Sequence, residues 1–409
     1  MNSTLQKSNW LALSAVAGFM LATQPALAAT QPEMEVVAEW NRLPYVIDNA
    51  DAEAAWKEND TKAMLHGVKV DAKGNIYVST ARWGGPEVPA TLSQLVKKEG
   101  QWALKPFPST EMNDVNNPQG LKAVLGFEID RNNVMWILDQ GHIAGAPNKP
   151  GDEKLIGWDL NSHKEVARYV FTNDQVDFNC SFLNDVAVDN DRGVIYITDS
   201  GIMCHPLKGA LLVYNIKQGQ AKRVLSDPKW VNDQPGFTFS IHDEKVLKDK
   251  DGKVNPMLTG ADGIALSGDK KTLYWTNLTG NRLMSVPTAL LRDFSNSEAE
   301  IEKGIRVVNT LPSNTDGMTA DRNGNLYLTA LTLNGLMKRD AKTGKVSPFV
   351  TSNDIAWPDT IGWAPNGDLY FVSNHLNSWV GGEMDFDHPE VANFRIYKVH
   401  VGGKPYTAK

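Results

Sequence analysis

Three aspartates, an asparagine and a histidine occupy equivalent positions of a pattern that recurs along this sequence of 409 residues. Each directly precedes one copy of the pattern, and the six residues at these channel positions are His66, Leu125, Asn184, Asp262, Asp316 and Asp359. Carboxylates held together in a confined place are costly unless a cation or protons compensate their charge. Oxygen-rich groups suit Ca²⁺ or Mg²⁺. The sequence therefore predicts that these residues form one site.

The residue types suggest roles. Asn184, Asp262 and Asp316 are predicted to hold a divalent metal, with calcium preferred and Mg, Mn or Zn left open. Such an ion would polarise a carbonyl group and activate water. His66, Asp316 and Asp359 are the predicted catalytic residues, because an imidazole or a carboxylate can move the proton. The alternative interpretation is that each aspartate only caps its own turn.

The recurring pattern predicts the elements that position these residues. Each copy has two alternating apolar runs around a turn rich in Gly, Asn and Asp, which is typical of a β-hairpin. The copies are Gly67–Ser79, Gly126–Leu138, Asp185–Thr198, Gly263–Thr276, Gly317–Thr329 and Thr360–Val372. A third strand often follows the hairpin.

Six such units at roughly 40 to 80 residue spacing indicate a six-bladed β-propeller. The channel positions would then begin the innermost strands and line one mouth of the central channel. The run Met34–Trp40 precedes the first copy, and we expect it to close the ring as the outer strand of the last blade. A β-sandwich also has many short strands, but it does not need the same hairpin six times.

The composition limits the partners. The formal net charge is −7, and no run of basic residues suggests a nucleic-acid partner. No later stretch is long and apolar enough to span a bilayer. A monomer that handles a small molecule, with no membrane association after processing, is therefore expected.

The first 28 residues resemble a secretory signal peptide, and residues 29–409 are predicted to form a single domain. Lys7 provides the positive start, an apolar run follows, and Ala26-Leu-Ala28 is typical of a cleavage site. The alternative is a membrane anchor. The short form of the signal favours a bacterial periplasm, although export to the cell exterior is left open. The only two cysteines, Cys180 and Cys204, flank the third hairpin, and because an exported chain permits a disulfide we predict that they form one. Two separate buried thiols are the alternative.

Several short motifs occur in an order that resembles the major royal jelly/yellow protein family along the whole mature chain. Among them are Ala81-Arg-Trp83, Trp136-Ile-Leu-Asp-Gln-Gly141, Phe182-Leu-Asn-Asp-Val-Ala-Val-Asp189, Tyr196-Ile-Thr-Asp-Ser-Gly201 and Trp357-Pro-Asp359. The resemblance implies a six-bladed propeller related in fold to gluconolactonase-like hydrolases. It does not imply one activity.

Three functions follow as hypotheses. The leading one is a metal-dependent, lactonase-like hydrolase, because Asn184 and Asp262 match two of the metal-binding positions of those enzymes. The first-blade position, a glutamate there, is His66 here, which places the hydrolase mechanism in doubt. The second is a binding protein for a cationic small molecule such as a biogenic amine. The third, from the family resemblance alone, is a dopachrome-conversion-like isomerase.

Other residues with chemical potential are given structural interpretations. His142 and His375 lie after the second and sixth hairpins and are interpreted as loop residues. Four tryptophans, Trp83, Trp357, Trp363 and Trp379, are interpreted as packing between blades.

Overall fold

The computed structural model describes residues 31–242, 244–245 and 257–408. The predicted signal peptide lies outside the described residues. Pro32–Lys409 form one compact unit.

Six antiparallel sheets of four strands each confirm the six-bladed propeller. Blade one contains β2 (Val68–Val70), β3 (Ile76–Ser79), β4 (Leu92–Lys98) and β5 (Gln101–Pro106). Blade two contains β6 (Val124–Ile129), β7 (Val134–Asp139), β8 (Lys154–Asp159) and β9 (Lys164–Val170). Blade three contains β10 (Leu183–Asp189), β11 (Val194–Asp199), β12 (Ala210–Asn215) and β13 (Gln220–Leu225).

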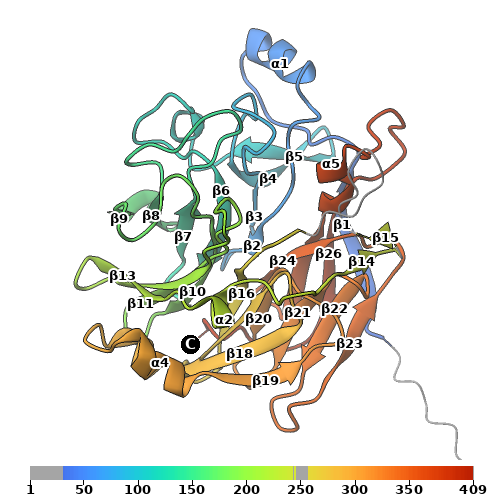
Figure 1. Cartoon of the computed structure of the whole chain (residues 1–409). Coiled ribbons are helices and arrows are strands. Elements are labelled where there is room, and N and C mark those ends of the chain that lie inside the picture. Colours follow the sequence, from blue (N-terminus) through green and yellow to red (C-terminus); the bar gives the residue numbers. More distant parts are fainter. Residues whose placement is uncertain (1–30, 243, 246–256, 409) are drawn as a thin grey trace, which may run out of the picture. The chain divides into compact units, whose positions relative to one another are not determined.

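The other three blades continue around the ring (Figure 1). Blade four contains β16 (Ala261–Leu266), β17 (Thr272–Asn277), β18 (Arg282–Pro287) and β19 (Arg306–Thr310). Blade five contains β20 (Met318–Ala320), β21 (Leu326–Ala330), β22 (Gly335–Arg339) and β23 (Val346–Thr351). Blade six contains β24 (Pro358–Trp363), β25 (Asp368–Ser373), β26 (Phe394–His400) and β1 (Met34–Trp40).

Strand β1 closes the ring as the sequence predicts. It pairs antiparallel with β26, from Met34 opposite Val399 to Trp40 opposite Phe394. The first described strand therefore completes the sheet of the last blade and joins the ends of the ring.

Short helices and one small ribbon lie in the connections between strands. They are α1 (Ala50–Lys57), α2 (Pro228–Val231), α3 (Thr288–Arg292), α4 (Glu298–Gly304), α5 (Leu376–Gly381), the 3₁₀ turn Glu111–Asn113 and the ribbon of β14 (Ser240–Ile241) with β15 (Glu244–Lys245). In the described part of the chain, no helix has the length and apolar character needed to cross a membrane.

The innermost strands of neighbouring blades approach closely because small residues begin the repeats. A side chain on Gly263 would place its Cβ 2.3 Å from the Asp316 carbonyl oxygen, and one on Gly317 would lie 2.6 Å from that of Asp359. Only glycine permits these approaches. The channel positions of successive blades are therefore drawn together around the axis.

Local irregularities in the innermost strands turn the channel positions away from the regular pairing. The register shifts between Val124 and Phe127 in β6, and at the equivalent points of β10, β16 and β24. Such bulges locally bend a strand and re-aim its side chains. The channel position and the first residue of the repeat lie inside each of these four shifts.

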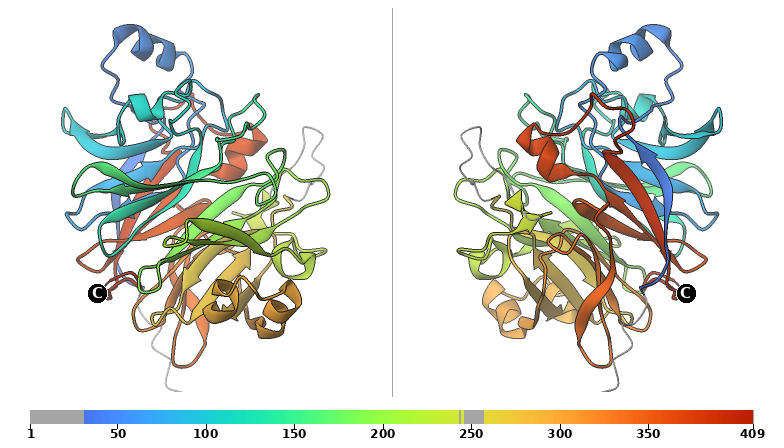
Figure 2. Two further views of the ribbon diagram at one scale, coloured as in Figure 1. Left: turned by 90° about the vertical axis from the view of Figure 1, so that its left-hand side faces the viewer. Right: turned by 90° about the vertical axis from the view of Figure 1, so that its right-hand side faces the viewer.

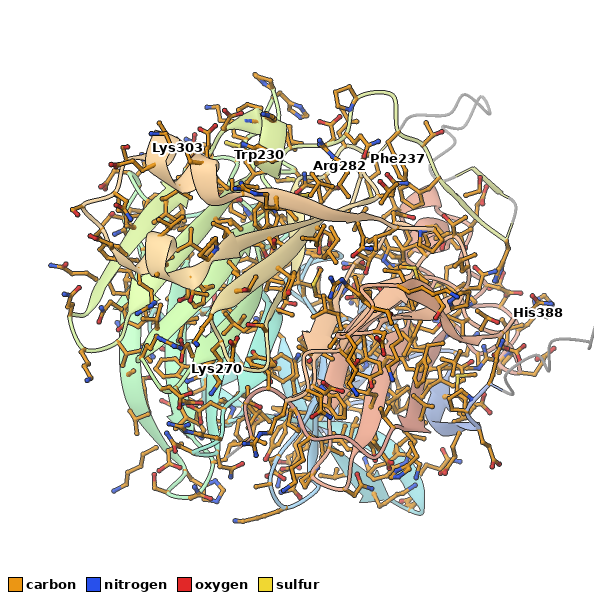
Figure 3. All side chains as sticks on the ribbon, turned by 90° about the horizontal axis from the view of Figure 1, so that it is seen from below. Trp230, Phe237, Lys270, Arg282, Lys303 and His388 are labelled. Atoms are coloured by element: carbon orange, nitrogen blue, oxygen red, sulfur yellow. A yellow bond between two sulfur atoms is a disulfide. The ribbon has the colours of Figure 1, made fainter. Side chains whose placement is uncertain are left out.

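The hydrophobic core lies between neighbouring blades. Tyr196 of blade three and Trp275 of blade four, both fully buried, belong to one apolar cluster. The Trp275 indole N–H donates a hydrogen bond to the Trp230 carbonyl. Figure 3 shows Trp230 and Lys270 at opposite ends of blade four. The strands therefore span the ring from one face to the other.

The C-terminal segment covers the mouth of the channel opposite the channel positions. The Tyr406 hydroxyl accepts a hydrogen bond from the backbone N–H of Val188 at 3.2 Å, and its own N–H donates to the Ala320 carbonyl at 3.0 Å. Tyr406 thereby joins blades three and five. Figure 2 shows the C-terminus and helix α5 on opposite faces of the ring.

Candidate functional site

A cavity of about 990 Å³ opens on the face of the ring that carries α5, and five of the six channel positions line it. These are Leu125, Asn184, Asp262, Asp316 and Asp359. The structure thus brings together the three aspartates and the asparagine that the repeat pattern selects. The sixth position, His66, is fully buried and is not a lining residue.

The carboxylates at the floor of the cavity are held in a chain of hydrogen bonds. Asn184 Nδ2 donates to Asp262 Oδ2 at 2.9 Å and to Ser200 Oγ at 3.0 Å. Asp262 and Asp316 lie close enough for each carboxyl group to shift the pKa of the other.

Burial dominates the acid–base behaviour of this floor. It raises the pKa of Asp262 and of Asp316 well above the usual range, and the neighbouring carboxylates raise both further. Burial also raises the pKa of Asp359 to about 7. The floor therefore carries more protons near neutral pH than exposed aspartates would, and an arriving cation can displace them.

Two residues outside the cavity lining orient the carboxylates. The Trp357 indole N–H donates to Asp316 Oδ2 at 2.7 Å, and Asn374 Nδ2 donates to Asp359 Oδ2 at 2.7 Å. Trp357 is fully buried and has a left-handed backbone, with φ of 50°. This conformation is strained for a bulky residue and often accompanies functional sites. Trp357 therefore orients Asp316, a role that the sequence interpretation of packing between blades did not include.

His66 lies behind an aromatic wall. Its Nδ1 is 3.2 Å from Asp359 Oδ2, and its ring centroid is 4.1 Å from that of Trp83. Burial lowers the pKa of His66 to about 3, so the imidazole is neutral at physiological pH. The predicted catalytic role for His66 meets a physical obstacle, because Trp83 and not His66 lines the cavity. A neutral imidazole in this place supports Asp359.

Aromatic residues form one side of the cavity. Trp83 lies 5.4 Å from Phe182 and the His142 ring stacks on Phe182 at 5.8 Å, both measured between ring centroids. All three line the cavity. His142 is therefore a partly buried wall residue, unlike the sequence interpretation of a loop histidine. His375 begins helix α5 and is not a lining residue.

A fourth buried carboxylate, Asp185, lies outside the six channel positions. It lines the cavity beside Asn184, and burial raises its pKa to about 6. Asp185 begins the third repeat, where four other copies have glycine. An acidic residue at a position that is otherwise glycine or threonine was the signal that could have identified it.

The described residues do not fit the predicted divalent ion. Asn184, Asp262 and Asp316 do lie together, but the asparagine presents its N–H to Asp262, and Asp316 accepts an indole N–H. Nowhere in the described residues do three His, Cys, Asp or Glu side chains form a group that could hold a metal.

A disulfide between Cys180 and Cys204 fixes another side of the cavity and confirms the predicted pairing. Cys204 lines the cavity together with its neighbours Met203 and His205. The bond ties this wall to the segment that precedes Asn184. A disulfide is typical of an oxidising compartment, which agrees with the predicted export.

Native protein is expected to contain no free thiol. Titration with a thiol reagent in denaturant should find none before reduction and two after it. The Cys180→Ala/Cys204→Ala variant should lose roughly 3 kcal/mol of unfolding free energy, because the bond closes a loop in the unfolded chain. Two reactive thiols in the unreduced protein would contradict this expectation.

The fold and the cavity together define a six-bladed propeller with an acidic floor and apolar walls at one mouth of its channel. Residues 123–404 match the sequence model of the family described as major royal jelly protein. The chain therefore belongs to the major royal jelly protein family, as its motifs indicate.

Curated relatives include three insect proteins. Major royal jelly protein 5 of Apis mellifera is 26% identical over 62% of this chain and 41% of its own length. Major royal jelly protein 1 of the same species is 22% identical over 80% of this chain and 77% of its own length. Protein yellow of Drosophila erecta is 22% identical over 88% of this chain and 67% of its own length. The chain thus spans less than half of the first of these relatives.

Solved structures show the same fold. A luciferin-regenerating enzyme has a TM-score of 0.52 and 16% identity, with 91% of this chain and 97% of that chain covered. A candidate gluconolactonase has a TM-score of 0.50 and 11% identity, with 93% and 94% covered. At these identities the likeness concerns the architecture and not the chemistry.

Proposed function

We propose that this protein binds a cationic small molecule in the cavity, with the positive group at the carboxylate floor. One observation carries the proposal. The described residues that line the cavity include five aspartates and neither lysine nor arginine. Four of these aspartates, at positions 185, 262, 316 and 359, are nearly completely buried. An acidic, partly dehydrated site attracts cations and excludes anions.

The surroundings of the floor support an organic cation. The aromatic rings of Trp83 and Phe182 line the same cavity as the carboxylates. A cation near an aromatic face gains further attraction from the ring. Pockets that combine apolar walls with a few convergent charged groups are typical of small-molecule sites. An amine that carries an apolar group meets all these features.

Calorimetry with three probes of similar shape and different charge tests the proposal. Phenethylamine, phenethyl alcohol and 3-phenylpropionate are titrated at pH 8 into protein treated with a chelator. We expect the amine to bind at least about tenfold more tightly than the alcohol, and the anion not to bind. Equal affinity for the amine and the alcohol, or binding of the anion, would contradict the proposal.

Hydrolysis of a lactone is the second candidate, and the Asp262–Asp316 pair favours it. A carboxyl that keeps its proton can protonate a leaving oxygen, while its ionised partner can take a proton from water. Turnover of a lactone panel, measured with and without chelator, separates this chemistry from the metal-dependent form expected from the sequence. Absence of turnover in both conditions would exclude a hydrolase.

A further inference from the structure

The cavity is much larger than its carboxylate floor requires. Its volume of about 990 Å³ lies at the upper end of the range for sites that bind drug-sized ligands. A small amine held at the floor would occupy only part of this space. The chemical character of the walls above the floor therefore indicates the chemical character of the rest of the ligand.

Apolar side chains continue from the floor to the mouth. Leu278 and Leu376 line the cavity and are nearly buried, with exposed fractions of 3% and 5%. Met203, Leu258 and Val380 line the same cavity but are 52%, 46% and 49% exposed. We call these last three residues the apolar rim.

The apolar rim is unusual for this surface. Seven large hydrophobic side chains are exposed in the described part of the chain, and three of the seven belong to the rim. They come from separate segments, namely the loop after β11, the segment before β16 and helix α5. Exposed apolar residues that converge at a pocket often mark a binding surface.

We infer that the ligand is an amphiphilic cation with an extended apolar chain, whose ammonium group lies at the aspartates and whose chain reaches the apolar rim. This inference rests on the proposed function and adds the class of ligand. The aspartates of the floor would bind the charged group, and the apolar side chains from Leu278 to Met203 would contact the chain along its length. None of the described residues that line the cavity is a lysine or arginine that could pair with a carboxylate at the far end of such a chain.

A series of linear alkylamines from butylamine to decylamine tests the inference by calorimetry. Each methylene that moves from water into the apolar wall is expected to raise the affinity about fourfold. The increase should continue until the chain passes the rim and then stop. An affinity independent of chain length would overturn the inference while leaving butylamine binding, and hence the proposed function, intact.

Variants of similar size identify the rim as the cause. In the Met203→Gln/Leu258→Asn/Val380→Thr variant, the factor by which each added methylene raises the affinity is expected to fall to near one for the longer amines. The dissociation constant of butylamine should change less than about twofold, because the floor is untouched. A matched control, Val166→Thr/Val170→Thr/Val307→Thr, alters exposed residues on β9 and β19 that do not line the cavity. This control variant should show the same gain in affinity per methylene as the wild-type protein.

Two outcomes would show that the apolar rim does not bind the chain of the ligand. If the rim variant keeps the full gain per methylene, the chain does not reach the rim and the inference is wrong. If wild-type protein is a dimer in sedimentation and the rim variant is a monomer, the rim is covered by a second copy, which also overturns it. Loss of butylamine binding in wild-type protein would instead count against the proposed function.

Discussion

Replacing Asp262 and Asp316 together by asparagine is expected to weaken amine binding about a hundredfold. The two carboxyl groups lie at the cavity floor and, when ionised, supply negative charge to an ammonium group. Removing one partner of a buried charged pair costs roughly 2–5 kcal/mol, and 1.36 kcal/mol corresponds to a tenfold change. Calorimetry with phenethylamine measures the effect.

The same double variant should be at least as stable as the wild-type protein. Asparagine has nearly the shape of aspartate and avoids the cost of burying carboxylates. The matched control is Asp233→Asn, which changes a partly exposed lining residue and should alter affinity no more than about fivefold. Wild-type affinity in a well-folded Asp262→Asn/Asp316→Asn protein would show that the cation binds elsewhere.

Asp359 is expected to make the protein less stable as the pH rises from about 4 to 7. Its pKa increases from 3.8 in the unfolded chain to about 7 in the folded protein, because the side chain is buried. The folded state therefore holds a proton that the unfolded state releases, and the unfolding free energy decreases with pH over this window. A shift of about three pKa units corresponds to about 4 kcal/mol.

Urea unfolding of wild-type protein and the Asp359→Asn variant between pH 4 and pH 8 measures this contribution. The difference between their unfolding free energies should change by about 4 kcal/mol in favour of the variant as the pH rises. The carboxamide oxygen of asparagine can take the place of Oδ2 and still accept from Asn374 Nδ2, so the fold should persist. An exposed control, Asp354→Asn, should follow the wild-type profile. Parallel profiles for wild-type and Asp359→Asn would contradict the assignment.

The architecture could be predicted from the sequence because it repeats. Each hairpin contains its own alternation and turn residues, and comparing six copies reveals the equivalent positions. The same comparison located Asp262, Asp316 and Asp359 as neighbours, although they are far apart in the chain. The closing strand β1 and the Cys180–Cys204 bond followed from simple counts of strands and cysteines.

The functional details depend on contacts between residues that no repeat relates. The left-handed backbone of Trp357 aims its indole at Asp316, which is 41 residues away in the sequence. Trp83, in the loop after β3, packs against the ring of His66, which is fully buried and does not line the cavity. The metal hypothesis counted oxygen-bearing residues, whereas in the structure Asn184 donates to Asp262 and Asp316 accepts from Trp357.

A crystal structure of the protein with phenethylamine at pH 8 tests the central claim most directly. We predict that the ammonium nitrogen lies about 2.7–3.2 Å from a carboxylate oxygen of Asp262 or Asp316, with the phenyl ring against the apolar wall. An ammonium group at the rim with the phenyl ring on the aspartates, or a cavity without the amine, would contradict the claim that the carboxylate floor is a cation site.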